Sequence, residues 1–473
     1  MKKKRIMALV MAGLMAGTLA GCGGSSSSST TATSQSSAAA TTAADAATDA
    51  AAAATTEVAA EAETESSSKT KLVANDEAAE TTEGSYQPEN GATIEVFTVK
   101  EEIVGVIDNI ISEFQKKYPG VTVNHTYGSD GETVLATRLA SNDVPDVMQV
   151  YSLDAAYKAD YDAGYLMDLT NESFMNNIGN TILDITKYEG VQFSMPVTVS
   201  TYAVYYRKDL FEQAGINSVP ATYDEFIEDL QKLQDSGIEA PVALDFMSSA
   251  GQISERLCGE LNPDCPTDFQ AVADGEYDAS ESKTLQTYAK FLTDIKPYAT
   301  KDALGMDRDA AVQDIVNGTS AVMFNGSWLL SQFLTADANI DIGYFPMPSP
   351  LLDTPQVAIN VDTSWAIGSD TQYPEACKAF LDFLSQADIA TEYYNVDGNI
   401  SYVNGVKYDK TQLMDVYNTV MAGNAFATVG NSWPTFDLRD DIAAAAQGYL
   451  QDGDADAFYE ACGEAIDFYY NQQ

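Results

Sequence analysis

Histidine and basic side chains are scarce in this 473-residue chain. His125 is the single histidine, and no Gly-x-Ser-x-Gly nucleophile elbow accompanies it, so we predict a structural place for it rather than catalysis. Only 25 lysines and arginines stand against 70 aspartates and glutamates, which gives a formal net charge of −45. Nucleic acids and anionic lipids attract proteins through cationic side chains. The charge balance therefore argues against either as a partner.

Cysteine is also rare, with five in the chain, and their spacings do not resemble a zinc site. Cys258 and Cys265 are close enough for a local disulfide, but free thiols are an equally open alternative. Cys377 and Cys462 fall in helical patterns, where cysteine is typically a small buried hydrophobe. We predict no metal and no cofactor.

The N-terminus has the pattern of an export signal. Four bases at residues 2–5 precede an apolar run at 6–20 that is too short to span a bilayer comfortably. The run ends in Leu19-Ala20-Gly21-Cys22, the lipobox pattern of bacterial lipoproteins, in which the cysteine takes a diacylglyceryl group. We therefore expect residues 1–22 to be a lipoprotein signal peptide and Cys22 to be the lipidation site.

Residues 23–90 are rich in serine, threonine and alanine and contain only two bases, Lys69 and Lys71. Such a composition buries too little apolar surface to offset the entropy of ordering, so we predict a disordered linker. A spacer of this length suits a protein tethered to the outer face of the cytoplasmic membrane, at the surface of a Gram-positive cell. The remaining residues, 91–473, hold 19 bases and 59 acids, a charge that suits a soluble monomer.

The remaining chain alternates predicted strands and helices, which indicates a parallel α/β sheet. The stretch 195–211 is rich in β-branched and aromatic residues and favours a strand, although Pro196 cannot donate to a ladder. A short helix closed by Gly215 follows, and Thr222 and Glu225 then have capping-box spacing before another helix. Val104, Ile107, Ile110, Ile111, Phe114 and Tyr118 trace one face of an earlier helix.

Several of these stretches resemble, in the same order, segments of extracellular solute-binding proteins of family 1, the maltose-binding type. They are residues 114–121 with 145–147, 163–170, the strand-to-helix segment 195–225, 318–328 with its Gly-x-Trp, 343–348, and 365–381. The resemblance implies a two-lobe periplasmic-binding-protein-like fold of type II, with three crossings at a hinge and a ligand cleft between the lobes. The first lobe would contain residues 91–198 and 341–364, and the second 199–340 and 365–473.

Ligands in such sheets bind beyond the carboxyl ends of the strands. The side chains at these points are aromatic and neutral-polar, as suits the apolar face and hydroxyl rim of a sugar. The candidate ligand contacts are Lys100, Glu101, Tyr151, Ser152, Thr198, Ser200, Tyr202, Asp245, Phe246, Asn325, Ser327, Trp328 and Trp433. The third tryptophan, Trp365, lies inside a predicted strand, and we expect it in the core.

The resemblance implies a binding lipoprotein of an ABC importer, not an enzyme, that captures a carbohydrate, most simply an oligosaccharide, and delivers it to a membrane permease. The acidic composition leaves open a cationic solute such as a polyamine. An exported glycan-processing enzyme is the remaining alternative, because such enzymes need two suitably spaced carboxylates and this chain has many acids.

Overall fold

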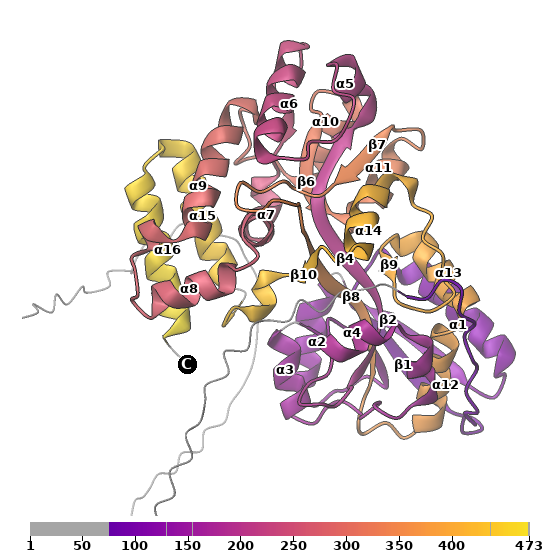
Figure 1. The fold of residues 1–473 in the computed structure, drawn as a ribbon. Coiled ribbons are helices and arrows are strands. Elements are labelled where there is room, and N and C mark those ends of the chain that lie inside the picture. Colours follow the sequence, from indigo (N-terminus) through magenta and orange to yellow (C-terminus); the bar gives the residue numbers. More distant parts are fainter. Residues whose placement is uncertain (1–74, 129, 154, 436, 472–473) are drawn as a thin grey trace, which may run out of the picture. The chain divides into compact units, whose positions relative to one another are not determined.

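The computed structural model describes residues 75–128, 130–153, 155–435 and 437–471 (Figure 1). The predicted signal peptide, Cys22 and residues 23–74 of the predicted linker lie outside these residues. Residues 66–473 group as one compact unit, and the description below concerns its described part.

One half of this unit, which we call the first lobe, begins with three parallel strands. Its elements are β1 (Thr93–Thr98), α1 (Val104–Lys117), β2 (Thr122–Tyr127), α2 (Gly131–Ala140), β3 (Val147–Val150), α3 (Ala155–Asp162), η1 (Ser173–Asn177) and α4 (Asn180–Ile185). Strand β1 pairs in parallel with both β2 and β3. Helix α1 buries Val106, Ile107, Ile110, Ile111 and Phe114, which confirms the apolar face expected from the sequence.

Two long strands cross from the first lobe to the other half. Strand β4 (Ser194–Arg207) pairs antiparallel with β8 (Val357–Ile367) over its first part, and β8 also pairs with β3. The register of the β4–β8 pair shifts between Pro196 and Thr198, because proline has no N–H to donate. From Tyr202 onward β4 pairs with β6 (Val322–Gly326), so one hydrogen-bonded sheet runs through both halves.

The other half, the second lobe, places helices around the far part of this sheet. Its elements are α5 (Lys208–Gln213), α6 (Tyr223–Asp235), β5 (Val242–Ala243), α7 (Phe246–Leu261), α8 (Cys265–Ala273), η2 (Ala279–Glu281), α9 (Lys283–Ile295), η3 (Lys296–Tyr298), α10 (Arg308–Asn317), β6, η4 (Ser327–Leu329), α11 (Leu330–Ala336) and β7 (Ile342–Phe345). Thr222 and Glu225 form the predicted capping box at the start of α6.

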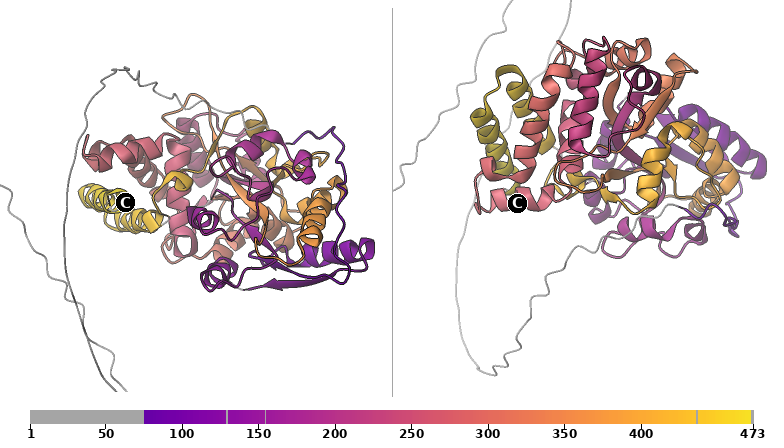
Figure 2. Two further views of the ribbon diagram at one scale, coloured as in Figure 1. Left: turned by 90° about the horizontal axis from the view of Figure 1, so that it is seen from below. Right: turned by 45° about the horizontal axis from the view of Figure 1, so that its top comes forward.

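The C-terminal region divides between the lobes. It contains α12 (Pro374–Leu384), α13 (Ala387–Asp397), β9 (Ile400–Ser401), η5 (Thr411–Leu413), α14 (Met414–Met421), β10 (Ala425–Ala427), η6 (Val429–Ser432), α15 (Asp437–Asp452) and α16 (Ala455–Tyr470). Helices α12 and α13 pack on α1, where Phe380 meets Phe114 edge to face at 5.2 Å. Helices α15 and α16 instead pack on α7 and α8, as the yellow and salmon ribbons of Figure 2 show.

This division differs from the prediction in two places. Strand β7 lies with the second lobe, because it pairs with the far part of β4, whereas 341–364 was predicted in the first lobe. The C-terminal stretch 365–473, predicted wholly in the second lobe, is divided between the two. The apolar faces of α12 and α13 are complementary to α1, so the chain returns to the first lobe before it finishes in the second. One apolar cluster joins the lobes, since it includes Ile94 of β1, Val199 of β4 and Tyr344 of β7. Trp365 of β8 is 1% exposed within it, which confirms its predicted place in the core.

Residues 75–90 also differ from the prediction of a disordered linker, because they hold specific contacts on the folded unit. The Asn75 side-chain amide donates to the carbonyl oxygens of Val403 and Val406 at 2.6 and 2.7 Å. Farther on, the Glu89 carboxylate accepts from the backbone N–H groups of Glu375 and Ala376 at the first turn of α12. A carboxylate at this position satisfies otherwise unpaired N–H groups and complements the helix dipole.

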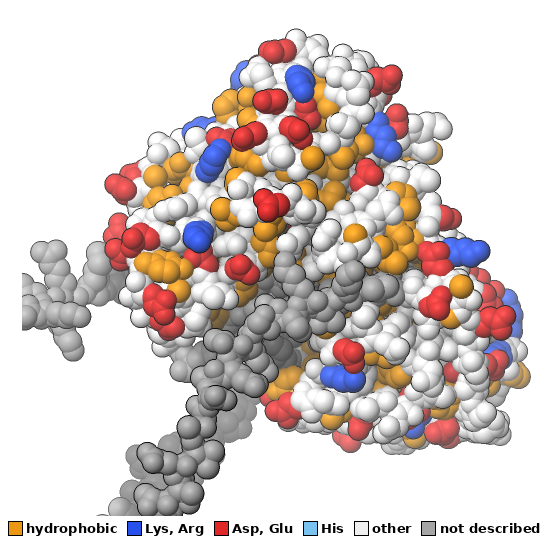
Figure 3. All heavy atoms as spheres, viewed as in Figure 1, with side chains coloured by type: hydrophobic (Ala, Val, Ile, Leu, Met, Phe, Trp, Pro, Cys, Tyr) orange, Lys and Arg blue, Asp and Glu red, His pale blue; other side chains and the backbone are white. Residues whose placement is uncertain are grey.

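The four cysteines within the described residues are buried free thiols: Cys258, Cys265, Cys377 and Cys462. Of the two alternatives left open for Cys258 and Cys265, a disulfide or free thiols, the structure therefore has free thiols. Among the residues described, no helix is long and apolar enough to cross a bilayer. On the face shown in Figure 3, acidic side chains visibly outnumber basic ones, as the composition predicts.

Candidate functional site

The ends of β1, β3 and β6 meet around the middle of β4 and β8, where the chain passes between the lobes. Lys100 lies just beyond β1, Tyr151 and Ser152 follow β3, and Ser327 and Trp328 follow β6. We call this region the interlobe junction. A connected set of buried polar side chains occupies it.

Lys100 lies at the centre of this set. Its ammonium donates to Asp397 Oδ1 at 3.0 Å and to Asp362 Oδ2, and Glu102 lies 3.7 Å away. Burial by itself would lower the pKa of Lys100, but the carboxylates of Asp362 and Asp397 outweigh it and hold the pKa well above its usual value. The lysine is therefore a permanent cation with three carboxylates around it.

Asp397, at the end of α13, is a fully enclosed carboxyl next to Lys100. Burial raises its pKa to about 6, Lys100 opposes the shift, and the charge of Asp362 adds to it. Its Oδ1 accepts from Lys100, whereas its Oδ2 is buried and has no hydrogen-bond partner within the described structure. A buried, unpaired carboxylate oxygen in this position is a free acceptor for a proton or a donor group.

Asn399 connects this charged group to the second lobe. Its amide nitrogen donates to Asp362 Oδ2 at 3.0 Å, and its amide oxygen accepts from the Ser327 hydroxyl at 2.5 Å. Ser327 Oγ in turn accepts from the backbone N–H of Thr201 at 3.0 Å. Two predicted site residues, Lys100 and Ser327, are thus brought together through residues that the sequence did not single out.

Tyr151 lies beside Lys100 at the edge of the first lobe. Its ring is partly buried, with its centroid 6.4 Å from that of Tyr157. Burial holds the pKa of Tyr151 well above its usual value, Lys100 opposes this, and the nearby acids, led by Asp362, add to it. The neighbouring Ser152 hydroxyl is buried and shares a 2.8 Å hydrogen bond with that of Ser364. Tyr151 thus keeps a partly exposed aromatic surface next to charged groups.

Trp328 is the aromatic residue that follows β6, in the second lobe. It is partly buried and packs against the apolar clusters of both lobes. Its indole lies over Gly326, where an added Cβ would be 2.0 Å from the ring. Glycine is therefore required two residues before the tryptophan, because any side chain would displace the ring.

Four other predicted residues of the junction lie on β4, on β6 or just beyond β1. Thr198 and Ser200 are buried in β4, and Thr198 Oγ1 has no partner within the described structure. Glu101 follows Lys100 and is exposed. Asn325, in β6, is fully buried, and its side-chain oxygen accepts from the N–H of Gly326 at 2.8 Å.

The structure does not bring Tyr202, Asp245 and Phe246 to the junction. Tyr202 is 2% exposed, packs in the core of the second lobe and donates to the carbonyl of Phe324 at 3.1 Å. Phe246 lies in the same core. The Asp245 carboxylate accepts from the Ser249 hydroxyl at 2.6 Å, and burial raises its pKa.

Trp433 is also buried in the second lobe, at 3% exposure. Its ring stacks on that of Phe269 with centroids 5.6 Å apart and an interplanar angle of 27°. This position differs from the open stacking surface predicted from its Ser-Trp-Pro loop. The helices that follow, α15 and α16, complete a core around it.

Sequence reasoning missed Asp362, Asp397 and Asn399. Asp362 is a charged residue inside a strand that is otherwise almost wholly buried, and Asp397-Gly398-Asn399 is a turn sequence at a helix end. Both were available signals, because a buried charge needs a partner. What the sequence does not reveal is that the partner of both carboxylates is Lys100.

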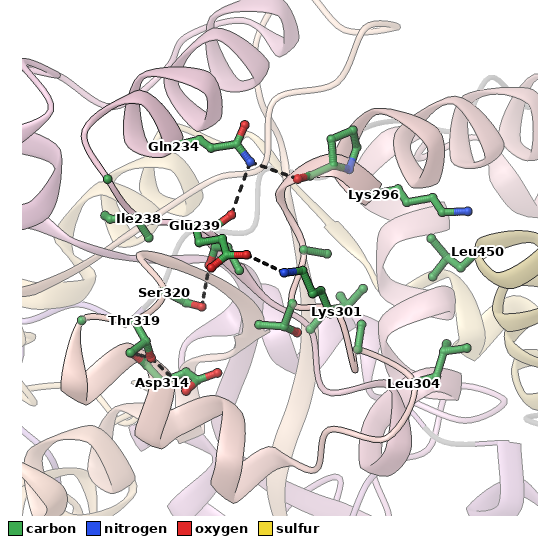
Figure 4. Close-up of a pocket in the computed structure, with 18 of the residues that line it drawn as sticks. Gln234, Ile238, Glu239, Lys296, Lys301, Leu304, Asp314, Thr319, Ser320 and Leu450 are labelled. Atoms are coloured by element: carbon green, nitrogen blue, oxygen red, sulfur yellow. Dashed lines mark hydrogen bonds and ion pairs between the residues drawn. The ribbon is translucent and has the colours of Figure 1, made fainter.

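A separate cavity of about 990 Å³ opens in the second lobe (Figure 4). Its walls come from the segments that precede β5 and β6 and from the end of α9, opposite to the ends that meet at the junction. An exposed ion pair between Glu239 and Lys301 spans 2.5 Å at this site. None of the lining residues is Phe, Tyr or Trp, so the cavity offers no stacking surface for a sugar ring.

Comparison with known proteins agrees with this architecture. The profile of the family described as bacterial extracellular solute-binding protein matches residues 98–391. A multiple sugar-binding protein of Streptococcus mutans is 26% identical over 385 residues, which cover 79% of this chain and 89% of that protein. The diacetylchitobiose binding protein DasA of Streptomyces coelicolor is 23% identical over 66% of this chain and 71% of its own length.

Solved structures show the same fold. The raffinose complex of the binding protein RafE superposes with a TM-score of 0.72 at 21% identity, covering 80% of this chain and 99% of that one. A chitin oligosaccharide binding protein gives a TM-score of 0.65 at 20% identity, with 80% and 99% covered. The two-lobe, type II fold expected from the sequence is confirmed. Since the family profile spans more than half of the chain, this protein belongs to the bacterial extracellular solute-binding proteins.

Proposed function

We propose that the protein captures a carbohydrate outside the cell and delivers it to the permease of an ABC importer. The observation that carries this proposal is the interlobe junction itself. Two partly exposed aromatic residues, Tyr151 after β3 and Trp328 after β6, border a set of buried polar side chains: Tyr151 lies near Lys100, and Trp328 follows Ser327. Aromatic faces suit the C–H faces of a sugar, and the polar layer supplies hydroxyl partners.

The names of related proteins support an oligosaccharide ligand. The relatives are described as binding multiple sugars or diacetylchitobiose, and structural neighbours were solved with raffinose and stachyose. We accordingly propose that Tyr151, Trp328 and Glu101 of the original candidates face the ligand. The buried side chains of Lys100, Ser152 and Ser327 would lie directly beneath them. Thr198, Ser200 and Asn325 would lie behind them, and Tyr202, Asp245, Phe246 and Trp433 would support the second lobe.

We further propose that the protein acts as a monomer anchored through a lipid on Cys22. The export pattern at residues 1–22 and the acidic folded part support this placement at the outer face of the cytoplasmic membrane. The permease subunits would be its protein partners. Residues 75–90, which pack on the first lobe and on the 403–406 loop, would join the tether to the folded unit.

A thermal-shift screen of purified, tag-free protein against neutral oligosaccharides tests the ligand class. The panel contains raffinose, stachyose and chitin oligosaccharides. Spermidine and putrescine are added to test the alternative of a cationic ligand. A ligand at 100 times its dissociation constant stabilises the protein by about 2.7 kcal/mol, which is easily measured. Stabilisation by an oligosaccharide and not by the polyamines supports the proposal, and the reverse result would replace it with the cationic alternative.

The polyamine alternative has one structural observation in its favour. Around Lys100, the carboxylates of Glu102, Asp362 and Asp397 outnumber the single ammonium. The enzyme alternative is tested on the same samples, by chromatography of each glycan after prolonged incubation. Hydrolysis products would contradict a protein that only binds.

A further inference from the structure

An unbroken series of hydrogen bonds runs beneath the interlobe junction from the second lobe to the first. The N–H of Thr201 donates to Ser327 Oγ, which commits the Ser327 proton to the amide oxygen of Asn399. The Asn399 amide nitrogen then donates to Asp362, which also accepts from Lys100. The direction of each bond is therefore set by its neighbour.

Every side chain in this series is shielded from solvent. Asn399 is fully buried, Ser327 is 3% exposed, and Asp362 and Lys100 are each 7% exposed. Hydrogen bonds in such a setting are strong, and breaking one leaves a buried polar group unpaired. The series is therefore a stiff connection rather than a fluctuating surface contact.

Asparagine has the side chain that fits the central position. It must accept from a hydroxyl on one side and donate to a carboxylate on the other, which an amide does and a carboxylate does not. An aspartate would place a second acceptor against Asp362, and an alanine would leave Ser327 and Asp362 each with an unmet partner. The chemistry of residue 399 thus decides whether the two lobes are connected here.

We propose that Asn399 is a positioning residue for ligand capture. It holds Ser327, and with it the neighbouring Trp328, in a set orientation relative to Lys100 and Tyr151 on the first lobe. Because Asn399 is fully buried, it acts through these residues and does not touch the ligand. This inference rests on the proposed function, since it concerns the residues that would face the sugar.

The charges around Asn399 make the inference testable by pH. Lys100 faces the group from the end of β1, Asp362 from β8, and Asp397 and Tyr393 from α13. Glu102 and Tyr151 also lie near the lysine. One ammonium already serves three carboxylates, so a further negative charge at residue 399 would have no cation to neutralise it.

The first test is Asn399→Asp, with Asn395→Asp as a matched control on the exposed face of α13. The probe is whichever of raffinose, stachyose or the chitin oligosaccharides stabilises the wild type in the thermal-shift screen. At pH 7.5 we expect Asn399→Asp to bind this probe at least about 10-fold more weakly than the wild type, and the control to bind within about 2-fold. The deficit should shrink as the pH falls, because protonation of the new carboxyl removes its charge. Equal affinity of Asn399→Asp and wild type at pH 7.5 would overturn the inference.

A rescue variant separates positioning from simple damage. Asn399→Asp combined with Asp362→Asn exchanges the amide and the carboxylate and leaves the charge of the group unchanged. We expect the double variant to recover to within about 3-fold of the wild type, whereas Asp362→Asn alone stays weak. A double variant no better than either single variant would refute a role for this hydrogen bond.

A measurement without ligand keeps the inference independent of the proposed function. Trp365 and Trp433 are buried, so quenching of tryptophan emission by acrylamide reports mainly on Trp328. We expect Asn399→Asp and Ser327→Ala each to increase quenching in the folded, ligand-free protein, and the exchange variant to restore it. Unchanged quenching in both single variants overturns the inference, whereas a wild type that binds no oligosaccharide overturns only the proposed function.

Discussion

Trp433 and Trp328 should respond in opposite ways to truncation. Trp433 is 3% exposed and stacks on Phe269, which is itself fully buried. Removing a buried tryptophan side chain costs about 3–5 kcal/mol, and an aromatic pair adds about 0.5–1.5 kcal/mol beyond its buried area. We therefore expect Trp433→Ala to lower the free energy of unfolding by about 4 kcal/mol, as measured by urea denaturation of the ligand-free protein.

Trp328 is only partly buried and borders the junction, so Trp328→Ala should cost less stability, about 2 kcal/mol. Its effect on binding should be larger, about 30-fold in affinity by titration calorimetry, because a central aromatic anchor is lost. The folded fraction of Trp433→Ala should bind within about 3-fold of the wild type. Trp433→Phe is the matched control, since it keeps an aromatic ring on Phe269. Near-wild-type stability of Trp433→Ala together with lost binding would refute this reasoning and make Trp433 a ligand contact.

Three further predictions follow from single residues. Burial raises the pKa of Asp160 to about 6, so the folded protein binds more protons than the unfolded chain between about pH 4 and 6, and stability falls as the pH rises through this window. At pH 7, the free energy of unfolding of Asp160→Asn should therefore exceed that of the wild type by about 1 kcal/mol, a value reduced for this half-exposed carboxyl. At pH 3.5 the two proteins should be equally stable, and a gain that persists there would contradict the burial argument. Gly326→Ala should displace the Trp328 ring and weaken oligosaccharide binding by at least about 10-fold, against an unchanged affinity for Gly448→Ala, where an added Cβ meets open space. Cys22→Ala should release the protein from membranes in a detergent partition assay, and full membrane retention would remove the case for a lipid anchor.

Local patterns in the sequence determined much of the fold. The apolar spacing in α1, the capping box of α6, and the strand that contains Pro196 are all where short-range chemistry placed them. These features depend on residues a few positions apart, which interact in almost any fold that contains the element. The order of such segments was also enough to indicate the family, because it reflects the topology of the whole chain.

The tertiary structure decided what no local pattern could. Helices α12 and α13 return to the first lobe because their apolar faces meet α1, and this complementarity joins residues more than 250 positions apart. Tyr202 and Trp433 looked like open aromatic contacts, yet the helices of the second lobe bury both. An aromatic residue after a strand is compatible with either place, and only the packing of distant elements selects one.

The same holds for the polar group beneath the junction. The sequence placed Lys100 and Ser327 at strand ends, but their partners Asp362, Asp397 and Asn399 come from a crossing strand and a helix end far along the chain. A carboxylate in a buried strand needs a partner, but the sequence alone does not show which residue that partner is. Burial in the assembled lobes makes the choice of hydrogen-bond partners specific, because in the low dielectric of the interior each donor must meet an acceptor.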